Sequence, residues 1–216
     1  MPEIVLYSYW RSSSSYRVRF ALAHKGLPYR YEAVNLLGRE QRDASHLSRS
    51  PTGYLPCIAI DGRTMIESVA ILELLDALFP EPPLYPADPW QRARVRAMVE
   101  LINAGIQPLQ NLNVLERHSA DPGERIAWAK HFNERGLAAL EQVMATNDAS
   151  GVRGDFAFGD TLTAADMCLV PQVYGARRFG VDVAQYPRVL SAAQAAGATS
   201  AAQAAAPEAQ PDAVVP

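Results

Sequence analysis

The chain has 216 residues, of which 49% are apolar and 20% are charged, and its formal net charge is −3. A chain of this length can bury a large core without a disulfide or a metal, and its near-neutral charge argues against a nucleic-acid or acidic-membrane partner. It has no apolar run of membrane-spanning length, and its first residues lack a basic region followed by a long apolar one, so we expect no export. Cys57 and Cys168 lie far apart and the histidines are scattered, so we expect a cytoplasmic protein with neither a disulfide framework nor a metal site.

The first predicted elements are a strand, a helix and a strand. Residues 4–7 are an apolar run typical of a buried strand, and apolar residues recur at helical spacing from Tyr16 until Gly26 and Pro28 end the helix. Residues 29–34 alternate between apolar and polar, as a half-buried strand does. Two strands joined through a helix are expected to be parallel.

A hairpin and a helix follow. The apolar runs 57–60 and 64–66 flank Asp61-Gly62, a strong hairpin signal because glycine tolerates positive φ. Ser68 is predicted to cap a helix that ends near Phe79. The order βαβ followed by ββα predicts a thioredoxin-like domain over residues 1–80, so the fold class expected for the first part of the chain is α/β.

The rest of the chain is predicted to be all-helical. Residues 81–88 have the composition of a stiff proline-rich linker, and residues 89–216 form the second domain. Asp88 caps a helix that continues toward Leu115, Asp121 opens another, and Thr163 with Asp166 forms a capping box for a third helix that Pro171 is expected to kink. The Ala- and Pro-rich end, residues 191–216, predicts a short helix and a loose tail.

The run from Trp10 to Arg19 contains four consecutive serines, at positions 12–15, where the first helix begins. One of them could simply be an N-cap. A helix entrance with several hydroxyl donors can also hold an anion, because the first N–H groups of a helix have no partner within it. Trp10 could either wall a pocket at this entrance or pack under the serine loop.

These features resemble the zeta class of cytosolic glutathione transferases. Residues 7–22 are similar to the class signature, Arg-Ser-Ser-Cys-x-Trp-Arg-Val-Arg-Ile-Ala-Leu. The resemblance extends over nearly the whole chain, through residues 55–56, 67–71, 105–112, 159–160, 165–173 and 178–182. It implies a thioredoxin-like domain joined to a helical domain, glutathione as cosubstrate, a homodimer, and isomerisation of maleylacetoacetate in tyrosine and phenylalanine breakdown.

The chain departs from the class pattern at three positions. Ser14 stands where the class has its cysteine, and Tyr16 where it has tryptophan. Because the thiol of glutathione itself does the chemistry in this class, we expect Ser14 to alter the site without abolishing it. Glu67 stands where the class has glutamine, so a carboxylate there could pair with the amino group of the cosubstrate.

The resemblance also implies which residues form the site. Ser12, or else Ser13, would hydrogen-bond the glutathione sulfur, and a helix N-terminus lowers the pKa of a thiol. Arg11 and Arg178 would stabilise the enolate charge and the substrate carboxylate, although Arg178 could equally be a surface cation. The residues implied in glutathione binding are Ser14, Ser15, Tyr16, Arg17, Gln41, Leu55 with a cis bond to Pro56, Glu67, Ser68, Gln107, Asn111, Leu112 and Asn113. Gln107 and Asn111 could instead lie on a helix surface or at a dimer contact.

Three classes of function stay open. A glutathione-dependent isomerase would act on a small dicarboxylate-like substrate, either maleylacetoacetate or maleylpyruvate; the maleylpyruvate enzymes carry arginines where this chain has Leu112 and Asn113. A detoxifying transferase would join glutathione to α-halo acids or other small electrophiles. A non-catalytic relative would use the fold for protein contacts. Cys57 and Cys168 are expected to be core residues in any of the three.

Overall fold

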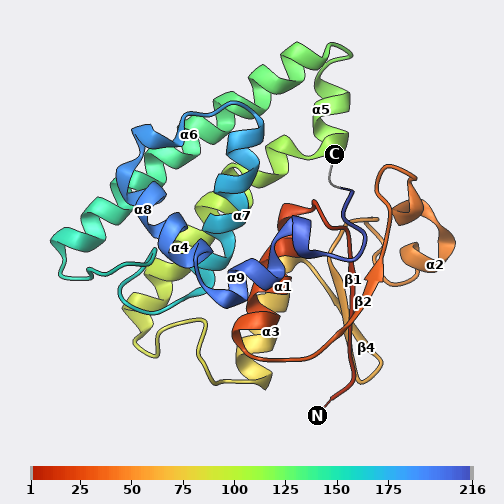
Figure 1. Cartoon of the computed structure of the whole chain (residues 1–216), viewed down its shortest axis with the longest axis horizontal. Helices are drawn as coiled ribbons and strands as arrows, with labels where there is room; N and C mark the ends of the chain where they lie inside the picture. The colour runs from red at the N-terminus through yellow and green to blue at the C-terminus, as the bar shows by residue number, and fades with distance from the viewer. Residues whose placement is uncertain (1, 215–216) are drawn as a thin grey trace. The chain divides into compact units, whose positions relative to one another are not determined.

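The structure is a computed structural model that describes residues 2–214. The chain divides into two compact units, one made of Met1–Leu84 with Thr199–Pro216 and the other of Tyr85–Ala198. Figure 1 follows the chain through both, with the strands early in the sequence and helices from α4 onward. This is the predicted class, a small mixed sheet domain followed by a helical domain.

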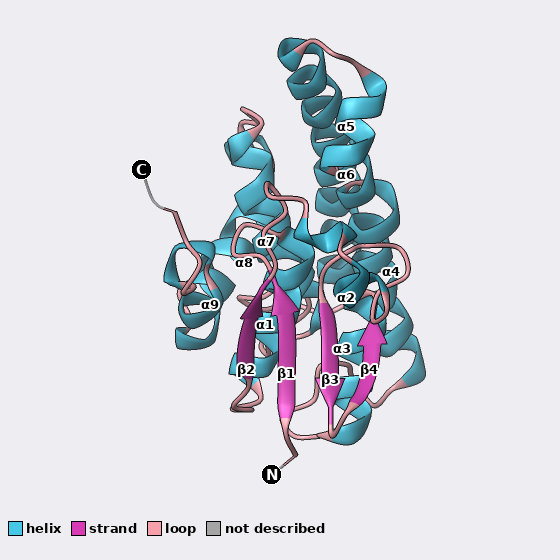
Figure 2. Ribbon diagram, turned by 90° about the vertical axis from the view of Figure 1, so that its right-hand side faces the viewer, coloured by secondary structure: helices cyan, strands magenta, loops and turns pink. Residues whose placement is uncertain are grey.

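The first unit is built on a four-stranded sheet in the order β2-β1-β3-β4. β1 (Ile4–Ser8) pairs in parallel with β2 (Arg30–Ala33) and antiparallel with β3 (Cys57–Ile60), which pairs antiparallel with β4 (Arg63–Ile66). Figure 2 shows the four strands side by side in this order. The parallel pair and the hairpin at Asp61-Gly62 confirm the predicted βαβ and ββ units; Asp61 and Gly62 both have positive φ.

Two long helices cover one side of the sheet. α1 (Ser13–His24) and α3 (Ser68–Leu78) pack against each other, and their apolar residues Val18, Leu22, Ile71 and Leu75 are fully buried. α1 begins three residues before the predicted start, because Ser12 is the N-cap, and Gly26 with φ +62 follows its end. Shorter elements, η1 (Glu40–Arg42) and α2 (Ala44–Leu47), lie between β2 and β3.

The prediction that Ser68 caps α3 is wrong by one residue. Glu67 is the N-cap, with φ +66, and Ser68 is the first helical residue. The predicted linker also contains buried residues: Leu84 is fully buried, and its N–H donates to Asp76 Oδ1 at 2.7 Å. The Lys25 ammonium donates to the carbonyls of Phe79 and Pro82, so side chains of the first unit hold the start of this segment.

The second unit is helical. Its elements are α4 (Pro89–Gly105), η2 (Gln107–Gln110), α5 (Leu112–His118), α6 (Pro122–Ala149), α7 (Ala164–Arg178), η3 (Val183–Gln185) and α8 (Pro187–Gly197). α7 packs against α4 and α8, and α6 packs against the same two helices. The first helix ends at Gly105 instead of running toward Leu115, because Pro108 has no N–H to donate and turns the chain into η2. The predicted caps Asp88, Asp121 and the Thr163–Asp166 box are present, and α7 continues through Pro171.

The C-terminal segment differs most from its prediction. It forms α9 (Ser200–Ala205) and η4 (Pro207–Ala209), and α9 packs along α1 in the first unit. The segment was expected to belong to the helical domain and to end in a loose tail. Its polar backbone instead accepts hydrogen bonds from buried side chains of α1: the Tyr16 hydroxyl donates to Ala202 O, and Arg19 Nε donates to Ala205 O. Satisfying these buried donors fixes the segment.

Candidate functional site

The entrance of α1 places the serine run at the carboxyl end of β1. Ser12 has extended backbone angles, and its Oγ accepts a 3.2 Å hydrogen bond from the Ser15 N–H, which confirms that one serine is an N-cap. Arg11, Ser12, Ser13 and Ser14 are half-buried, so their polar groups are open to a ligand. The capping hydroxyl uses its lone pair for Ser15 and keeps its proton to donate.

The next three residues of α1 point into the protein. Ser15 is fully buried and its Oγ has no hydrogen-bond partner among residues 2–214, while the Tyr16 hydroxyl is used by Ala202 O. Arg17 is 1% exposed and its Nη1 donates to Ser68 Oγ at 3.0 Å. The Ser15 and Tyr16 N–H groups donate to the hydroxyl and the carbonyl of Ser12, so these three residues support the α1 entrance from within.

The start of α3 is a second polar corner of the same unit. Glu67 has φ +66, a conformation that a non-glycine residue rarely adopts and that occurs preferentially at ligand-binding positions. Ser68 follows it as the first residue of a helix of eleven residues. A carboxylate on Glu67 beside the partly positive N-terminus of α3 suits a ligand that carries an ammonium and a carboxylate on one carbon.

The Leu55–Pro56 peptide bond is cis, as the resemblance implied, and it leads directly into β3. Leu55 belongs to a buried cluster with Tyr9, Trp10 and Val34. Trp10 is therefore a buried core residue of the segment just before the serine run. The apolar cluster joins the segment before α1 to the segment before β3.

Gln41 lies in η1, and its Oε1 is buried without a hydrogen-bond partner among the described residues. A buried acceptor without a donor is costly, on the order of 1–3 kcal/mol. A ligand N–H would satisfy it. This orphaned oxygen, the Glu67 carboxylate and the two helix N-termini together fit a peptide-like molecule with amide, ammonium and carboxylate groups.

In the second unit, the structure brings Gln107 and Asn111 together. Gln107 is 9% exposed and its Nε2 donates to Asn111 Oδ1 at 2.7 Å. Leu112 and Asn113 follow on the exposed side of α5, and Arg178 is exposed at the end of α7. Arg178 thus has the accessibility of a ligand-binding cation and equally of a surface one.

A buried amide network that sequence reasoning missed holds this segment. Gln172 Nε2 donates to Asn133 Oδ1 and Asn133 Nδ2 donates to Gln110 Oε1, both at 2.7 Å. Asn133 is fully buried and Gln172 is 1% exposed. The network anchors η2, which carries Gln107. Gln110 and Gln172 lie in the two runs most typical of the zeta class, and that was the only signal for them.

The cysteines lie outside the candidate site. Both are fully buried, and burial raises the pKa of the Cys57 thiol to about 11, so it stays protonated near neutral pH. Their prediction as core residues is confirmed. Within residues 2–214 no group of His, Cys, Asp or Glu side chains could hold a metal ion, and no helix is long and apolar enough to span a membrane.

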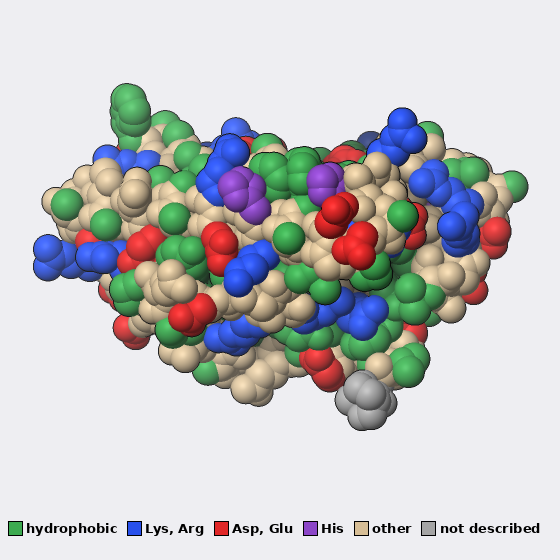
Figure 3. All heavy atoms as spheres, turned by 90° about the horizontal axis from the view of Figure 1, so that it is seen from above, with side chains coloured by type: hydrophobic (Ala, Val, Ile, Leu, Met, Phe, Trp, Pro, Cys, Tyr) green, Lys and Arg blue, Asp and Glu red, His purple; other side chains and the backbone are tan. Residues whose placement is uncertain are grey.

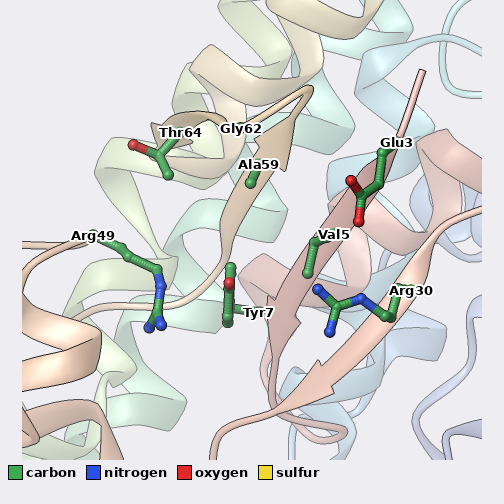
Figure 4. Close-up of a pocket in the computed structure, with 8 residues that line it drawn as sticks. All are labelled: Glu3, Val5, Tyr7, Arg30, Arg49, Ala59, Gly62 and Thr64. Atoms are coloured by element: carbon green, nitrogen blue, oxygen red, sulfur yellow. The ribbon is translucent and has the colours of Figure 1, made fainter.

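The surface of the protein carries a hollow on the sheet and a mixed distribution of charge. Figure 4 shows a shallow hollow on the sheet, where Arg30 and Arg49 flank Tyr7 and Val5, and none of the predicted site residues lines it. The Arg49 guanidinium stacks over the Tyr7 ring at 4.5 Å. On the face displayed in Figure 3, basic and acidic side chains are interspersed, in keeping with the small net charge of the chain.

Comparison with known proteins gives consistent results. Residues 6–83 match the family model for the glutathione S-transferase N-terminal domain. The chain is 43% identical over 210 residues to probable maleylacetoacetate isomerase 2 of Drosophila melanogaster, covering 96% of this chain and 89% of that protein.

Solved structures agree with the family model. The holo structure of a maleyl pyruvate isomerase, a bacterial glutathione S-transferase in the zeta class, superposes with a TM-score of 0.93 at 39% identity and covers 97% of this chain and 100% of the other. Maleylacetoacetate isomerase from Anaeromyxobacter dehalogenans, with dicarboxyethyl glutathione and citrate bound in its active site, gives a TM-score of 0.87 at 46% identity, with 100% coverage of both chains.

Proposed function

Because the chain belongs to the zeta-class glutathione transferase and maleylacetoacetate isomerase family, we propose that it is a glutathione-dependent isomerase that converts maleylacetoacetate to fumarylacetoacetate. The observation that carries the proposal is the entrance of α1, where Ser12 caps the helix and Arg11, Ser13 and Ser14 stay half-buried beside it. Helix N–H groups, a hydroxyl donor and a cation meet there, as a thiolate and an anionic substrate require.

Glutathione, when bound, supplies the thiolate whose reversible addition to the cis double bond turns it into a single bond that can rotate. The Ser12 hydroxyl would donate a hydrogen bond to the sulfur while its oxygen still accepts the hydrogen bond from the Ser15 N–H. Ser13 is the second candidate for that hydrogen bond. The Tyr16 N–H donates to Ser12 O, so the amides of Tyr16 and Arg17 would act on the sulfur through the positive end of the α1 dipole.

The remainder of the glutathione site would come from the other residues that the resemblance to the zeta class implied. Gln41 offers its orphaned oxygen to an N–H, and the Leu55 backbone beside Pro56 offers strand-like pairing. Glu67 and Ser68 would take the ammonium and carboxylate of the γ-glutamyl end. From the second unit we propose Gln107, Asn111, Leu112 and Asn113 as contacts to the cosubstrate.

Arg11 would stabilise the negative charge that develops on the substrate carbonyl. Its guanidinium lies 5.2 Å from the centre of the Trp10 ring, which limits the directions in which it can point. A fixed cation next to the developing charge contributes more than a mobile one, since little reorganisation is needed during the reaction. We propose Arg178 as a second cation for the carboxylate of the substrate.

Maleylpyruvate is the alternative substrate, and the structural similarity to a maleyl pyruvate isomerase supports it. Against it stand Leu112 and Asn113, where we expect arginines in a maleylpyruvate enzyme. Conjugation of glutathione to small α-halo acids would use the same thiolate. Rates on maleylacetoacetate, maleylpyruvate and dichloroacetate, measured with the same preparation, rank these three activities.

We also propose that the protein is a cytoplasmic homodimer in an aromatic amino-acid breakdown route. The resemblance to the zeta class supports this proposal. Light scattering on the purified protein tests the dimer, and a monomer at micromolar concentration contradicts it.

The test of the main proposal follows the absorbance of maleylacetoacetate with and without glutathione. We expect conversion only with glutathione, and a loss of about a hundredfold in kcat for Ser12→Ala and for Arg11→Ala. Ser191→Ala, at an exposed serine of α8, is the matched control and retains the full rate. Conversion without glutathione contradicts the mechanism, and the absence of glutathione binding by calorimetry favours a non-catalytic relative.

A further inference from the structure

We propose that Asp212 is a positioning residue that holds the loop before Ser12 in the shape the active site needs, so that the C-terminal segment is part of the catalytic apparatus. This inference rests on the proposed function, because it assigns a role toward glutathione binding at the α1 entrance. All the contacts that carry it lie within the first unit.

Asp212 reaches the loop directly. Its Oδ2 accepts a 3.0 Å hydrogen bond from the backbone N–H of Trp10, and its Oδ1 accepts a 2.7 Å hydrogen bond from the Tyr31 hydroxyl. Hydrogen bonds to a carboxylate are stronger than those between neutral groups. The carboxylate thus ties the loop before α1 to a residue of β2, and it does so from the end of the chain.

Arg19 holds the same loop through its carbonyls. Its Nη1 donates to Tyr9 O at 3.3 Å and to Ser8 Oγ at 3.1 Å, and its Nη2 donates to Trp10 O at 2.9 Å. Its Nε donates to Ala205 O at the end of α9, so the guanidinium links the C-terminal segment to the loop as well. Arg19 is fully buried, so its guanidinium N–H groups cannot exchange these acceptors for water.

The loop transmits this hold to Ser12. The Ser12 N–H donates to Tyr9 O at 3.0 Å, the same carbonyl that accepts from Arg19. On the Trp10 side, the ring lies in the buried cluster with Tyr9, Val34 and Leu55, and Ala213 packs against that cluster. Asp212 therefore binds the loop at Trp10, close before Ser12, and the Trp10 ring packs with Leu55, which precedes the cis Pro56.

The consequence concerns the accuracy of the site. The hydroxyl of Ser12 must lie within a few tenths of an ångström of its place to hydrogen-bond a thiolate, and a loop needs a supporting shell to hold a group so well. Asp212 supplies that support by accepting a hydrogen bond from the backbone N–H of Trp10. We expect its loss to loosen the loop while the packing of α9 on α1 keeps the fold.

The experiment compares Asp212→Ala with Asp212→Asn. Both variants remove the same negative charge, but asparagine keeps an oxygen for the Trp10 N–H and an amide that can donate to the Tyr31 oxygen. We expect Asp212→Ala, which removes the hydrogen bonds to both Trp10 and Tyr31, to weaken glutathione binding about tenfold by calorimetry. Asp212→Asn keeps the affinity within about threefold of wild type, so any difference between the two is not an effect of charge.

A second readout needs no glutathione. Backbone amide hydrogen exchange of the peptide that spans residues 9–13, measured by mass spectrometry on the free protein, should be faster in Asp212→Ala and near the wild-type rate in Asp212→Asn. Asp155→Ala, at an exposed carboxylate of the second unit, is the control and changes neither readout. Thermal unfolding of each variant shows whether the fold is kept.

The outcomes separate this inference from the proposed function. If wild type fails to bind glutathione, the proposed function is overturned. If wild type binds it and Asp212→Ala binds it equally well, the positioning role is overturned, even when the exchange of residues 9–13 accelerates. Equal weakening in Asp212→Ala and Asp212→Asn also overturns it, since the effect would then come from charge.

Discussion

The guanidinium of Arg17 donates a 3.0 Å hydrogen bond to the hydroxyl of Ser68, and this contact joins the N-terminal part of α1 to the first residue of α3. Both side chains are buried, with 1% and 4% of their surface accessible. The two helix N-termini proposed to bind glutathione are therefore braced against each other inside the protein, and a ligand that spans them meets a rigid pair.

Removing the Ser68 hydroxyl should weaken glutathione binding. Ser68→Ala takes away a group that Arg17 orients and that is proposed to contact the γ-glutamyl carboxylate, so we expect a Kd about tenfold higher by calorimetry. The exposed Ser191→Ala is the matched control and should leave the Kd unchanged. An unchanged Kd in Ser68→Ala would show that the carboxylate is held by the α3 amides alone.

Ser12 is predicted to have two separable roles, as N-cap and as thiolate donor. Ser12→Ala removes both, and we expect a loss of about 1 kcal/mol in the free energy of unfolding together with the loss of activity. Ser12→Asp keeps a strong cap acceptor but has no proton to donate, so it should restore stability and leave activity lost. Urea unfolding and isomerase assays on the two variants make this comparison, and an active Ser12→Asp enzyme would move the thiolate role to Ser13.

Ser14 occupies the position of the cysteine in the zeta-class signature, half-buried in the first turn of α1. We expect Ser14→Cys to turn over substrate within a few-fold of the wild-type rate, because the reacting thiol belongs to glutathione. The new thiol lies at a helix N-terminus, which lowers its pKa and makes it reactive. Intact-mass spectrometry after iodoacetamide should show one added group relative to wild type, whose own cysteines are buried. A rate increase of a hundredfold would instead show that the protein thiol takes part in the chemistry.

Asp166 should make the stability of the protein depend on pH. Its Oδ1 accepts from the Ala157 N–H and its Oδ2 from the Thr163 N–H, and burial raises the pKa of this carboxyl to about 6 despite these hydrogen bonds. Since the pKa in the folded state lies above the ordinary value of 3.8, folding favours the protonated form. This contribution is fully present below about pH 4 and is lost as the pH rises through about 6.

The comparison of wild type with Asp166→Asn isolates this effect, because asparagine does not titrate. The difference in the free energy of unfolding, wild type minus variant, should fall by roughly 2–3 kcal/mol between pH 4 and pH 7, at about 1.4 kcal/mol per unit of pKa shift. Urea unfolding at a series of pH values measures it. A difference that grows with pH would mean that the hydrogen bonds outweigh burial and that the pKa is lowered.

Local patterns predicted the elements around the site well. An N-cap within the serine run, the hairpin at Asp61-Gly62 and the capping box of Thr163 with Asp166 each depend on residues a few positions apart, and all are present, the cap being Ser12. Two local signals were weighed wrongly: Pro108 ends the helix that began at Pro89, and Glu67 takes the cap that was assigned to Ser68. The C-terminal segment was assigned to the helical domain because its contacts with α1 join residues far apart in the sequence.

By itself the sequence determined the fold class and the serine-rich entrance of α1, because strand alternation, helix caps and turn glycines are written in neighbouring residues. The resemblance of its motifs to the zeta class indicated the family. Only the tertiary structure decided what holds that entrance in place. The N–H of Trp10 and the carboxylate of Asp212 are 202 positions apart, and Arg19 reaches Ala205 over 186. Such pairs form because buried donors and acceptors must find partners wherever the folded chain brings them, and no pattern of neighbouring residues states that requirement.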